Sequence, residues 1–345
     1  MYKMILSEYN TLGKNFLPRK QLSNNYKNNE TVLLTFLLDL AHQALIKLAL
    51  EPQWKAMLLM NHKECYIEKD VFETIDHIVS GVSRGFTTVI ELDCATSLKH
   101  INQDSIIADL GCSKIISQSI RYWLALGLID EYVYQVKSFD LYVFDDPKGC
   151  ILAPLITNIF LCNLDDDLLA QHKNLNNSWL NTRLKYIRYK CYIFVLLSNS
   201  NSVANVISFF RSWFNIYNIC LRDHAYNIQA TQQGIICLNY HIMTSDHELI
   251  NLGIKVDINP SIQALTLFVQ TNREIIYLLR LGSINKLLRH LKLKLSLWII
   301  VYGRYNSYSI AMQLERICAS QIRAVILRKH PKKSKNWINK KYLSK

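Results

Sequence analysis

The segment Thr87–Asp93 reads TTVIELD, a run rich in β-branched residues that ends in an acid. Such a run predicts a buried strand. The chain on either side favours helices, because residues 31–60 carry apolar side chains at helical spacing and residues 106–130 repeat that signal. From Thr271 onward, apolar residues recur every three or four positions, with basic residues on the other face. The sequence therefore predicts an α+β protein that ends in a basic helical region.

The positive charge of the chain is concentrated in its last fifth. The 345 residues include 40 lysines and arginines against 27 acids, a formal net charge of +13. Residues 271–345 alone hold 17 lysines and arginines and two acids, Glu274 and Glu315, so the preceding 270 residues are close to neutral. This asymmetry is typical of a nucleic-acid-binding module joined to a globular body.

The most basic stretch is Arg328–Lys345, RKHPKKSKNWINKKYLSK. It has seven lysines, one arginine and one histidine around Trp337 and Tyr342, and no carboxylate side chain. Lysine and arginine neutralise phosphates and release counterions. An aromatic ring among them offers a face on which a base or a sugar can stack. Composition alone fits a solvated basic tail equally well.

Cysteines and apolar runs limit the class of protein. The nine cysteines stand singly and form no C-x-x-C pair, which argues against a disulfide framework or a zinc ribbon and favours a reducing compartment. The most apolar long run, residues 32–50, contains Asp39, His42 and Lys47, so no membrane span is expected. The polar N-terminus lacks the features of a signal or transit peptide. We therefore expect a protein that is made in the compartment where it acts.

The order of residues in the terminal stretch resembles a known signature. His330-Pro331, Lys333-Ser334, Trp337-Ile338 and Lys341-Tyr342 match H-P-x-K-S-x-x-W-I-x-x-K-Y, which ends the maturase domain (domain X) of group II intron-encoded proteins. Blocks that resemble the reverse transcriptase of that family precede it in the family's order: residues 39–56, 87–93, 120–130, 145–164 and 185–197. The resemblance spans residues 39–342.

The resemblance implies a domain organisation. Residues 1–30 form a polar lead-in with little order, and residues 31–250 form reverse-transcriptase-like fingers and palm of mixed helices and antiparallel sheet. A connector follows at 251–270, where Pro260-Ser261 indicates a turn. Residues 271–345 then form the helical, RNA-binding maturase region.

The polymerase chemistry of the family depends on residues that this chain has replaced. Residues 185–197, KYIRYKCYIFVLL, resemble the strand–turn–strand of the palm, in which two neighbouring aspartates bind metal. Those aspartates fall on Cys191 and Tyr192, and only Asp93 keeps an acid in the first metal-binding strand. Two-metal phosphoryl transfer needs several carboxylates around a pair of hard cations. We therefore expect no polymerase, no bound metal, and relic positions at Asp93, Cys191 and Tyr192.

The resemblance implies an RNA-binding intron maturase that assists splicing by stabilising the folded ribozyme, without polymerase or endonuclease activity. It also implies that the protein binds no cofactor of its own, because the intron RNA carries the Mg²⁺. We expect its partners to be intron-containing precursor RNA and other splicing factors, and its compartment to be a plastid whose genome encodes it, with a mitochondrion as second choice. The expected RNA-binding residues are Arg328, Lys329, His330, Lys332, Lys333, Lys335, Trp337, Lys340, Lys341 and Tyr342, with a secondary basic patch of Lys286, Arg289, Lys292 and Lys294.

Two other interpretations remain open from the sequence. A divergent RNA-directed DNA polymerase would use Asp93 with acids elsewhere, such as Asp145, Asp146 or those at 165–167. A non-catalytic scaffold would retain only protein contacts and would bind no RNA in a salt-dependent way.

Overall fold

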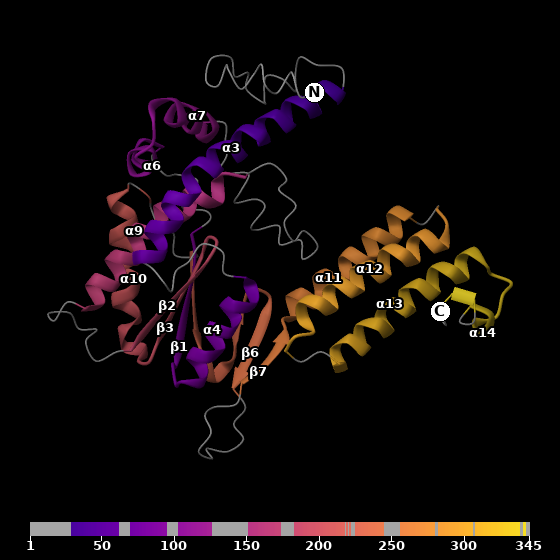
Figure 1. Ribbon diagram of the computed structural model, residues 1–345. Helices are drawn as coiled ribbons and strands as arrows, with labels where there is room; N and C mark the ends of the chain where they lie inside the picture. The colour runs from indigo at the N-terminus through magenta and orange to yellow at the C-terminus, as the bar shows by residue number, and fades with distance from the viewer. Residues whose placement is uncertain are drawn as a thin grey trace. The chain divides into compact units, whose positions relative to one another are not determined.

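The computed structural model describes residues 29–61, 70–94, 103–125, 151–173, 183–217, 219, 221, 225–244, 256–279, 282–305, 308–338 and 341–342. The described residues divide into two compact units (Figure 1). Unit 1 extends to Gln229, and unit 2 begins at Ala230. Both units combine helices with antiparallel strands, so the α+β class predicted from the sequence is confirmed.

Unit 1 is built around a four-stranded sheet. The strands are β1 (Thr88–Asp93), β2 (Leu184–Tyr189), β3 (Tyr192–Leu197) and β4 (Tyr226–Ala230), in the order β2-β3-β1-β4. β2 and β3 form a hairpin whose turn contains Lys190 at φ 53°, and β1 pairs antiparallel with β3 so that Asp93 lies opposite Tyr192. The predicted strand at 87–93 and the predicted strand–turn–strand at 185–197 are both confirmed.

Helices cover both faces of this sheet (Figure 1). On one face lie α9 (Ala153–Lys173) and α10 (Val203–Ile216), whose buried side chains join those of β1 and β3 in one apolar core. On the other face lies α4 (Val71–Ser83), which contacts β2 and β3. Gly81 of α4 faces Leu196 so closely that an added Cβ would stand 2.2 Å from Leu196 Cδ2.

The remaining helices of unit 1 are the long helix α3 (Asn29–Asn61), which packs on α9, and the pair α6 (Gln103–Leu110) and α7 (Lys114–Ala125). The buried Asp39 of α3 accepts hydrogen bonds from Trp123 Nε1 at 2.6 Å and from Gln43 Nε2 at 3.1 Å. Gln43 Oε1 in turn accepts from the Ile151 backbone N–H at 3.1 Å, just before α9. Asp39 and Gln43 of α3 therefore hold α7 and the residue just before α9 in place.

Unit 2 begins with a small sheet in the order β5-β6-β7, formed by β5 (Ile235–Cys237), β6 (Tyr240–Thr244) and β7 (Val256–Pro260). The helices α11 (Ile262–Leu279), α12 (Ile284–Tyr302) and α13 (Tyr308–Lys329) follow and contact one another. Trp298, Tyr302 and Phe268 are fully buried between them. The Tyr240 hydroxyl donates to the Val301 carbonyl at 2.9 Å and ties the sheet to the end of α12.

Two boundaries differ from those expected. Residues 256–270, predicted as part of a connector, form β7 and the first half of α11, because Ser261 caps that helix by accepting from the Ala264 N–H at 3.2 Å. The division between the units also lies before residue 250, since β6 pairs with β7 and not with the sheet of unit 1. The lead-in expected up to residue 30 lies almost entirely outside the described residues.

None of the helices in the described part of the chain combines the length and the apolar composition that a membrane crossing requires.

Candidate nucleic-acid interface

The end of α13 begins the site. Pro331 has no backbone N–H, and a proline disfavours the helical conformation in the residue before it, so the helix ends at Lys329. A turn follows in which the Lys333 N–H donates to the His330 carbonyl at 3.1 Å. Ser334 Oγ then accepts from the Trp337 N–H at 3.3 Å and begins the short helix α14 (Lys335–Ile338). The turn reverses the chain and brings Trp337 back towards His330.

Three aromatic rings meet at this turn, and we call them the ring cluster: His330, Trp337 and Tyr342. The His330 ring lies 5.4 Å from Trp337 in an edge contact and 6.1 Å from Tyr342 in a stacked one. Trp337 and Tyr342 meet edge to face at 6.0 Å, and the Tyr342 hydroxyl is 3.3 Å from His330 Nε2. The H-P, W and K-Y positions of the signature are thus brought together into one cluster.

Two lysines lie over the ring cluster. Lys341 Nζ is 4.7 Å from the centre of the Trp337 ring and 5.6 Å from that of Tyr342. Lys333 Nζ is 5.4 Å from the Trp337 ring centre. A ring face attracts a cation at these distances. Both lysines are exposed, so their remaining N–H groups can donate to an external anion.

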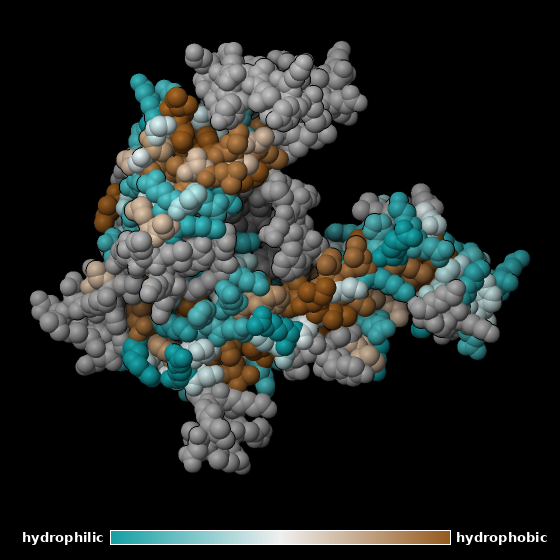
Figure 2. All heavy atoms as spheres, viewed as in Figure 1, coloured by the Kyte–Doolittle hydropathy of each residue, from teal (hydrophilic) through white to brown (hydrophobic). Residues whose placement is uncertain are grey.

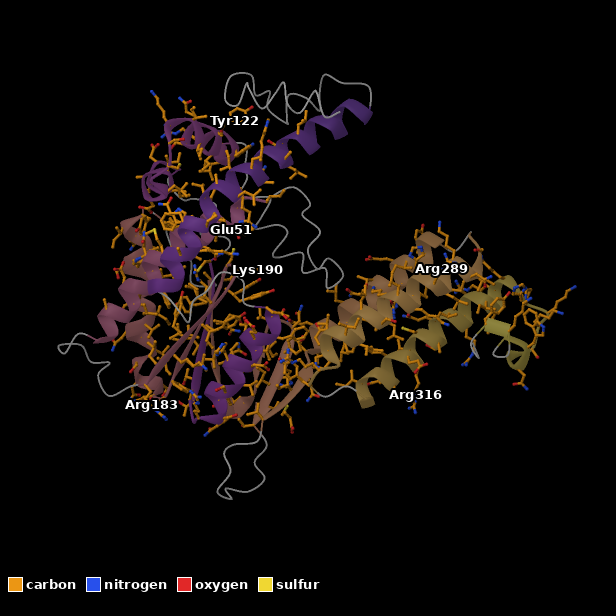
Figure 3. All side chains as sticks on the ribbon, in the orientation of Figure 1. Glu51, Tyr122, Arg183, Lys190, Arg289 and Arg316 are labelled. Atoms are coloured by element: carbon orange, nitrogen blue, oxygen red, sulfur yellow. The ribbon has the colours of Figure 1, made fainter. Side chains whose placement is uncertain are left out.

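A second basic patch begins at the same end of unit 2. Lys329 Nζ donates to the Gly282 carbonyl, next to Ser283, which caps the start of α12 by accepting from the Lys286 N–H at 3.3 Å. Lys286, Arg289 and Lys292 follow on α12 and are exposed. Figure 3 shows Arg289 on this helix. The terminal motif and the secondary patch, 36 or more residues apart in the chain, therefore lie at one end of the helical layer.

Lys294 does not belong to that patch, contrary to expectation. It is only 5% exposed. Its Nζ donates to Thr271 Oγ1 on α11 and lies 5.4 Å from the centre of the Phe268 ring. The physical reason is its position in the buried stripe of α12, between Leu291 and Trp298. An ammonium group enclosed in this way cannot reach a phosphate without leaving its partners.

The other expected RNA-binding residues next to the ring cluster in the chain differ in exposure. Arg328 and Lys332 are exposed, whereas Lys329 is half-buried, as are the three residues of the ring cluster. Lys335 lies in α14 but its side chain is outside the described part, as is all of Lys340. Figure 2 shows hydrophilic residues over this end of the helices of unit 2 and hydrophobic residues towards their opposite end.

The positions expected to be polymerase relics, Asp93, Cys191 and Tyr192, lie in unit 1. Cys191 is fully buried, and its carbonyl accepts from the Cys94 N–H at 2.9 Å. Tyr192 lies across from Asp93 on the same face of the sheet, and burial, with the nearby Asp93 and Glu91 charges, raises the pKa of its phenol. A buried thiol and a neutral phenol are poor ligands for Mg²⁺.

Glu91 is a second carboxylate at this place that the sequence interpretation missed. It lies two residues before Asp93 on β1, and side chains two apart in a strand share a face. Burial first, and then the Asp93 charge, raise the pKa of Glu91 to about 7, against a hydrogen bond with Asn227 that lowers it. The period of two in TTVIELD could have identified this pair. Within the described residues, no three His, Cys, Asp or Glu side chains gather where they could hold a metal ion.

Comparisons with protein-family models and with curated proteins found no match to this chain.

Proposed function

We propose that the protein is an RNA-binding intron maturase that assists splicing of group II or related introns, acting in a plastid on intron-containing precursor RNA together with other splicing factors. The observation that carries this proposal is the basic end of unit 2. There the ring cluster, the lysines above it and the start of α12 gather cations from two chain segments, with no acid in the sequence after Glu274 except Glu315. Glu315 precedes the end of α13 by 14 residues, or about 21 Å along the helix.

Such a surface stabilises folded RNA because it binds the folded conformer more tightly than the unfolded one. A folded ribozyme brings phosphates close together, and cations placed opposite them offset that repulsion and release counterions. A protein that binds the active RNA conformer more tightly than its competitors raises the population of that conformer. The two transesterifications then belong to the RNA and its Mg²⁺. Unit 2 supplies the affinity, and no catalytic group of the protein is needed.

Crosslinking in the native compartment tests this proposal. The protein is crosslinked to RNA, recovered, and the attached RNA is sequenced. We expect unspliced, intron-containing transcripts to be enriched, with contacts concentrated in one intron or a few. If recovered RNA contains no more intron sequence than a mock recovery does, the maturase proposal fails and the scaffold interpretation takes its place.

The pair of Glu91 and Asp93 favours testing one alternative, a divergent RNA-directed DNA polymerase. Both carboxylates lie on one face of β1. A metal ion bound there would lower the raised pKa of Glu91, so that both side chains would be ionised. Primer extension on an RNA template with Mg²⁺ or Mn²⁺ distinguishes the two functions. A maturase gives no extension, whereas extension that is lost in Asp93→Asn would establish the polymerase.

A further inference from the structure

We infer that the basic end of unit 2 binds base-paired RNA through the phosphates of both strands, and that the ring cluster supports lysines there and does not stack on unpaired bases. The inference rests on the proposed function, since it specifies which RNA the same surface takes. Three observations support it: the contacts of the three rings, the presence of cations from both the terminal turn and α12, and the regular spacing of the basic residues along α12.

The rings already use their surfaces for one another and for lysine. Trp337 makes edge-to-face contacts with His330 and Tyr342 and has two ammonium groups over its ring. Tyr342 is stacked with His330 at an interplanar angle of 18° and lies under Lys341. A nucleic-acid base that stacked on the face of Trp337 under a lysine, or on the face of Tyr342 that meets His330, would have to displace that neighbour. Proteins that bind single strands through stacking instead present ring faces that successive bases can occupy.

The lysines over the rings are arranged for phosphate. A ring beneath an ammonium group restricts a flexible side chain, so less conformational freedom is lost when a phosphate binds. Lys333 and Lys341 approach the cluster from the turn after α13 and from the segment after α14. The cluster thus presents two cations over one ring, whatever base the phosphate belongs to.

The start of α12 supplies a second row of cations. Lys286, Arg289 and Lys292 follow at three-residue intervals, so each is about 4.5 Å further along the helix axis. The Lys329 contact with Gly282 places this row beside the end of α13. Double-stranded RNA displays two phosphate backbones and is read mostly through shape, phosphates and 2′-hydroxyls. Two adjoining cation groups match two backbones better than they match one.

Binding of two RNAs by the full-length protein tests the inference. One RNA is a hairpin with a long paired stem, the other an unstructured strand of the same nucleotide count, and affinities are measured by fluorescence anisotropy over a series of salt concentrations. We expect the hairpin to bind at least tenfold more tightly. The double variant Lys286→Ala/Arg289→Ala should reduce the slope of log affinity against log salt for the hairpin by nearly two, since each phosphate contact contributes about 0.9.

The matched control is Arg316→Ala. Arg316 is exposed on α13, about 18 Å along the helix before Arg328 (Figure 3). Its substitution by alanine should leave the salt slope of hairpin binding unchanged. Trp337→Phe keeps a ring under the lysines and should change hairpin affinity less than twofold, whereas Trp337→Ala should lower it several-fold. Circular dichroism of each variant confirms that the helices remain folded.

The outcomes separate this inference from the proposed function. Equal or tighter binding of the unpaired strand overturns the inference, as does a hairpin slope that the α12 double variant leaves unchanged or that Arg316→Ala lowers equally. Salt-dependent RNA binding would then remain, and with it the proposed function. If neither RNA binds in a salt-dependent way, the proposed function fails as well.

Discussion

The Glu91 carboxyl group shows how one residue can make the stability of unit 1 depend on pH. Its folded-state pKa, about 7, lies above its ordinary value of 4.5 because burial and Asp93 disfavour the charged form. A raised pKa contributes stability that is fully present below 4.5 and is lost as the pH rises through 7. The neutral variant Glu91→Gln should therefore lose less stability than the original protein between pH 5 and pH 8. The difference should be on the order of 3 kcal/mol, measured by urea unfolding.

The control for this measurement is Glu73→Gln on α4, an exposed acid in the same unit. It should shift unfolding by less than about 0.5 kcal/mol at both pH values. An identical pH dependence in Glu91→Gln and in the original protein would show that Glu91 is ionised throughout.

Neighbouring lysines on α12 should behave in opposite ways. Lys292 is exposed, so Lys292→Ala should lower the salt slope of RNA binding by about 0.9 and leave the free energy of unfolding almost unchanged. Lys294 is buried against Thr271 and Phe268, so Lys294→Ala should lower stability by about 2 kcal/mol and leave the slope unchanged. Anisotropy titrations and urea unfolding on the same two samples test both statements. If Lys294→Ala lowers the salt slope, Lys294 contacts RNA and belongs to the RNA-binding surface after all.

Single residues were also the hardest part to predict. Composition placed Lys294 with the other cations, although Ile284, Leu287, Leu291, Lys294, Trp298 and Val301 follow one another at the three- and four-residue spacing of a buried stripe. That spacing was the sequence signal from which the burial of Lys294 could have been predicted. No sequence signal predicted the contact between Lys329 and Gly282, because it depends on how two helices pack and not on local sequence.

At the scale of elements, a β-branched run predicted the strand at 87–93 and helical periodicity predicted the long helix at 31–60, because each follows its own local pattern. The hairpin at 185–197, which the structure contains, was expected from the resemblance to the reverse transcriptase palm. The start of α11 was missed. Pro260-Ser261 was interpreted as a turn, but here a strand ends at proline and a helix is capped by serine with no residue between them. A strong cap and a loop share the same residue types, so local sequence cannot separate them.

The packing of α4 on the sheet depends on the absence of a side chain at residue 81. An alanine there would bring its Cβ to 2.2 Å from Leu196 Cδ2, so either the helix or the leucine must move. Overpacking of this kind costs about 1–3 kcal/mol, partly offset by the better helix propensity of alanine. We expect Gly81→Ala to lower the free energy of unfolding by about 1 kcal/mol or more in urea. Ser80→Ala, one residue earlier on α4, should change it little or raise it, and equal values for the two variants would contradict the close approach.

At the scale of the whole molecule, the charge asymmetry predicts where RNA affinity is located. The triple variant Lys332→Ala/Lys333→Ala/Lys335→Ala should reduce the salt slope of RNA binding by about two to three. Removing the same charge from unit 1, at Lys47, Lys55 and Lys114, should reduce it by less than one. Equal effects of the two triple variants would mean that the protein attracts RNA only through its net charge of +13.

The residues of the turn after α13 should differ in how readily they are substituted during evolution. A phosphate responds to positive charge, so an arginine can replace a lysine around the cluster, and a cation can move by a position, at little cost to affinity. Each of the three rings contacts both of the others, so a change in one removes two of the three contacts in the cluster. As substitutions accumulate, the arrangement of rings should therefore outlast both the identity of the surrounding basic residues and much of the sequence of unit 1.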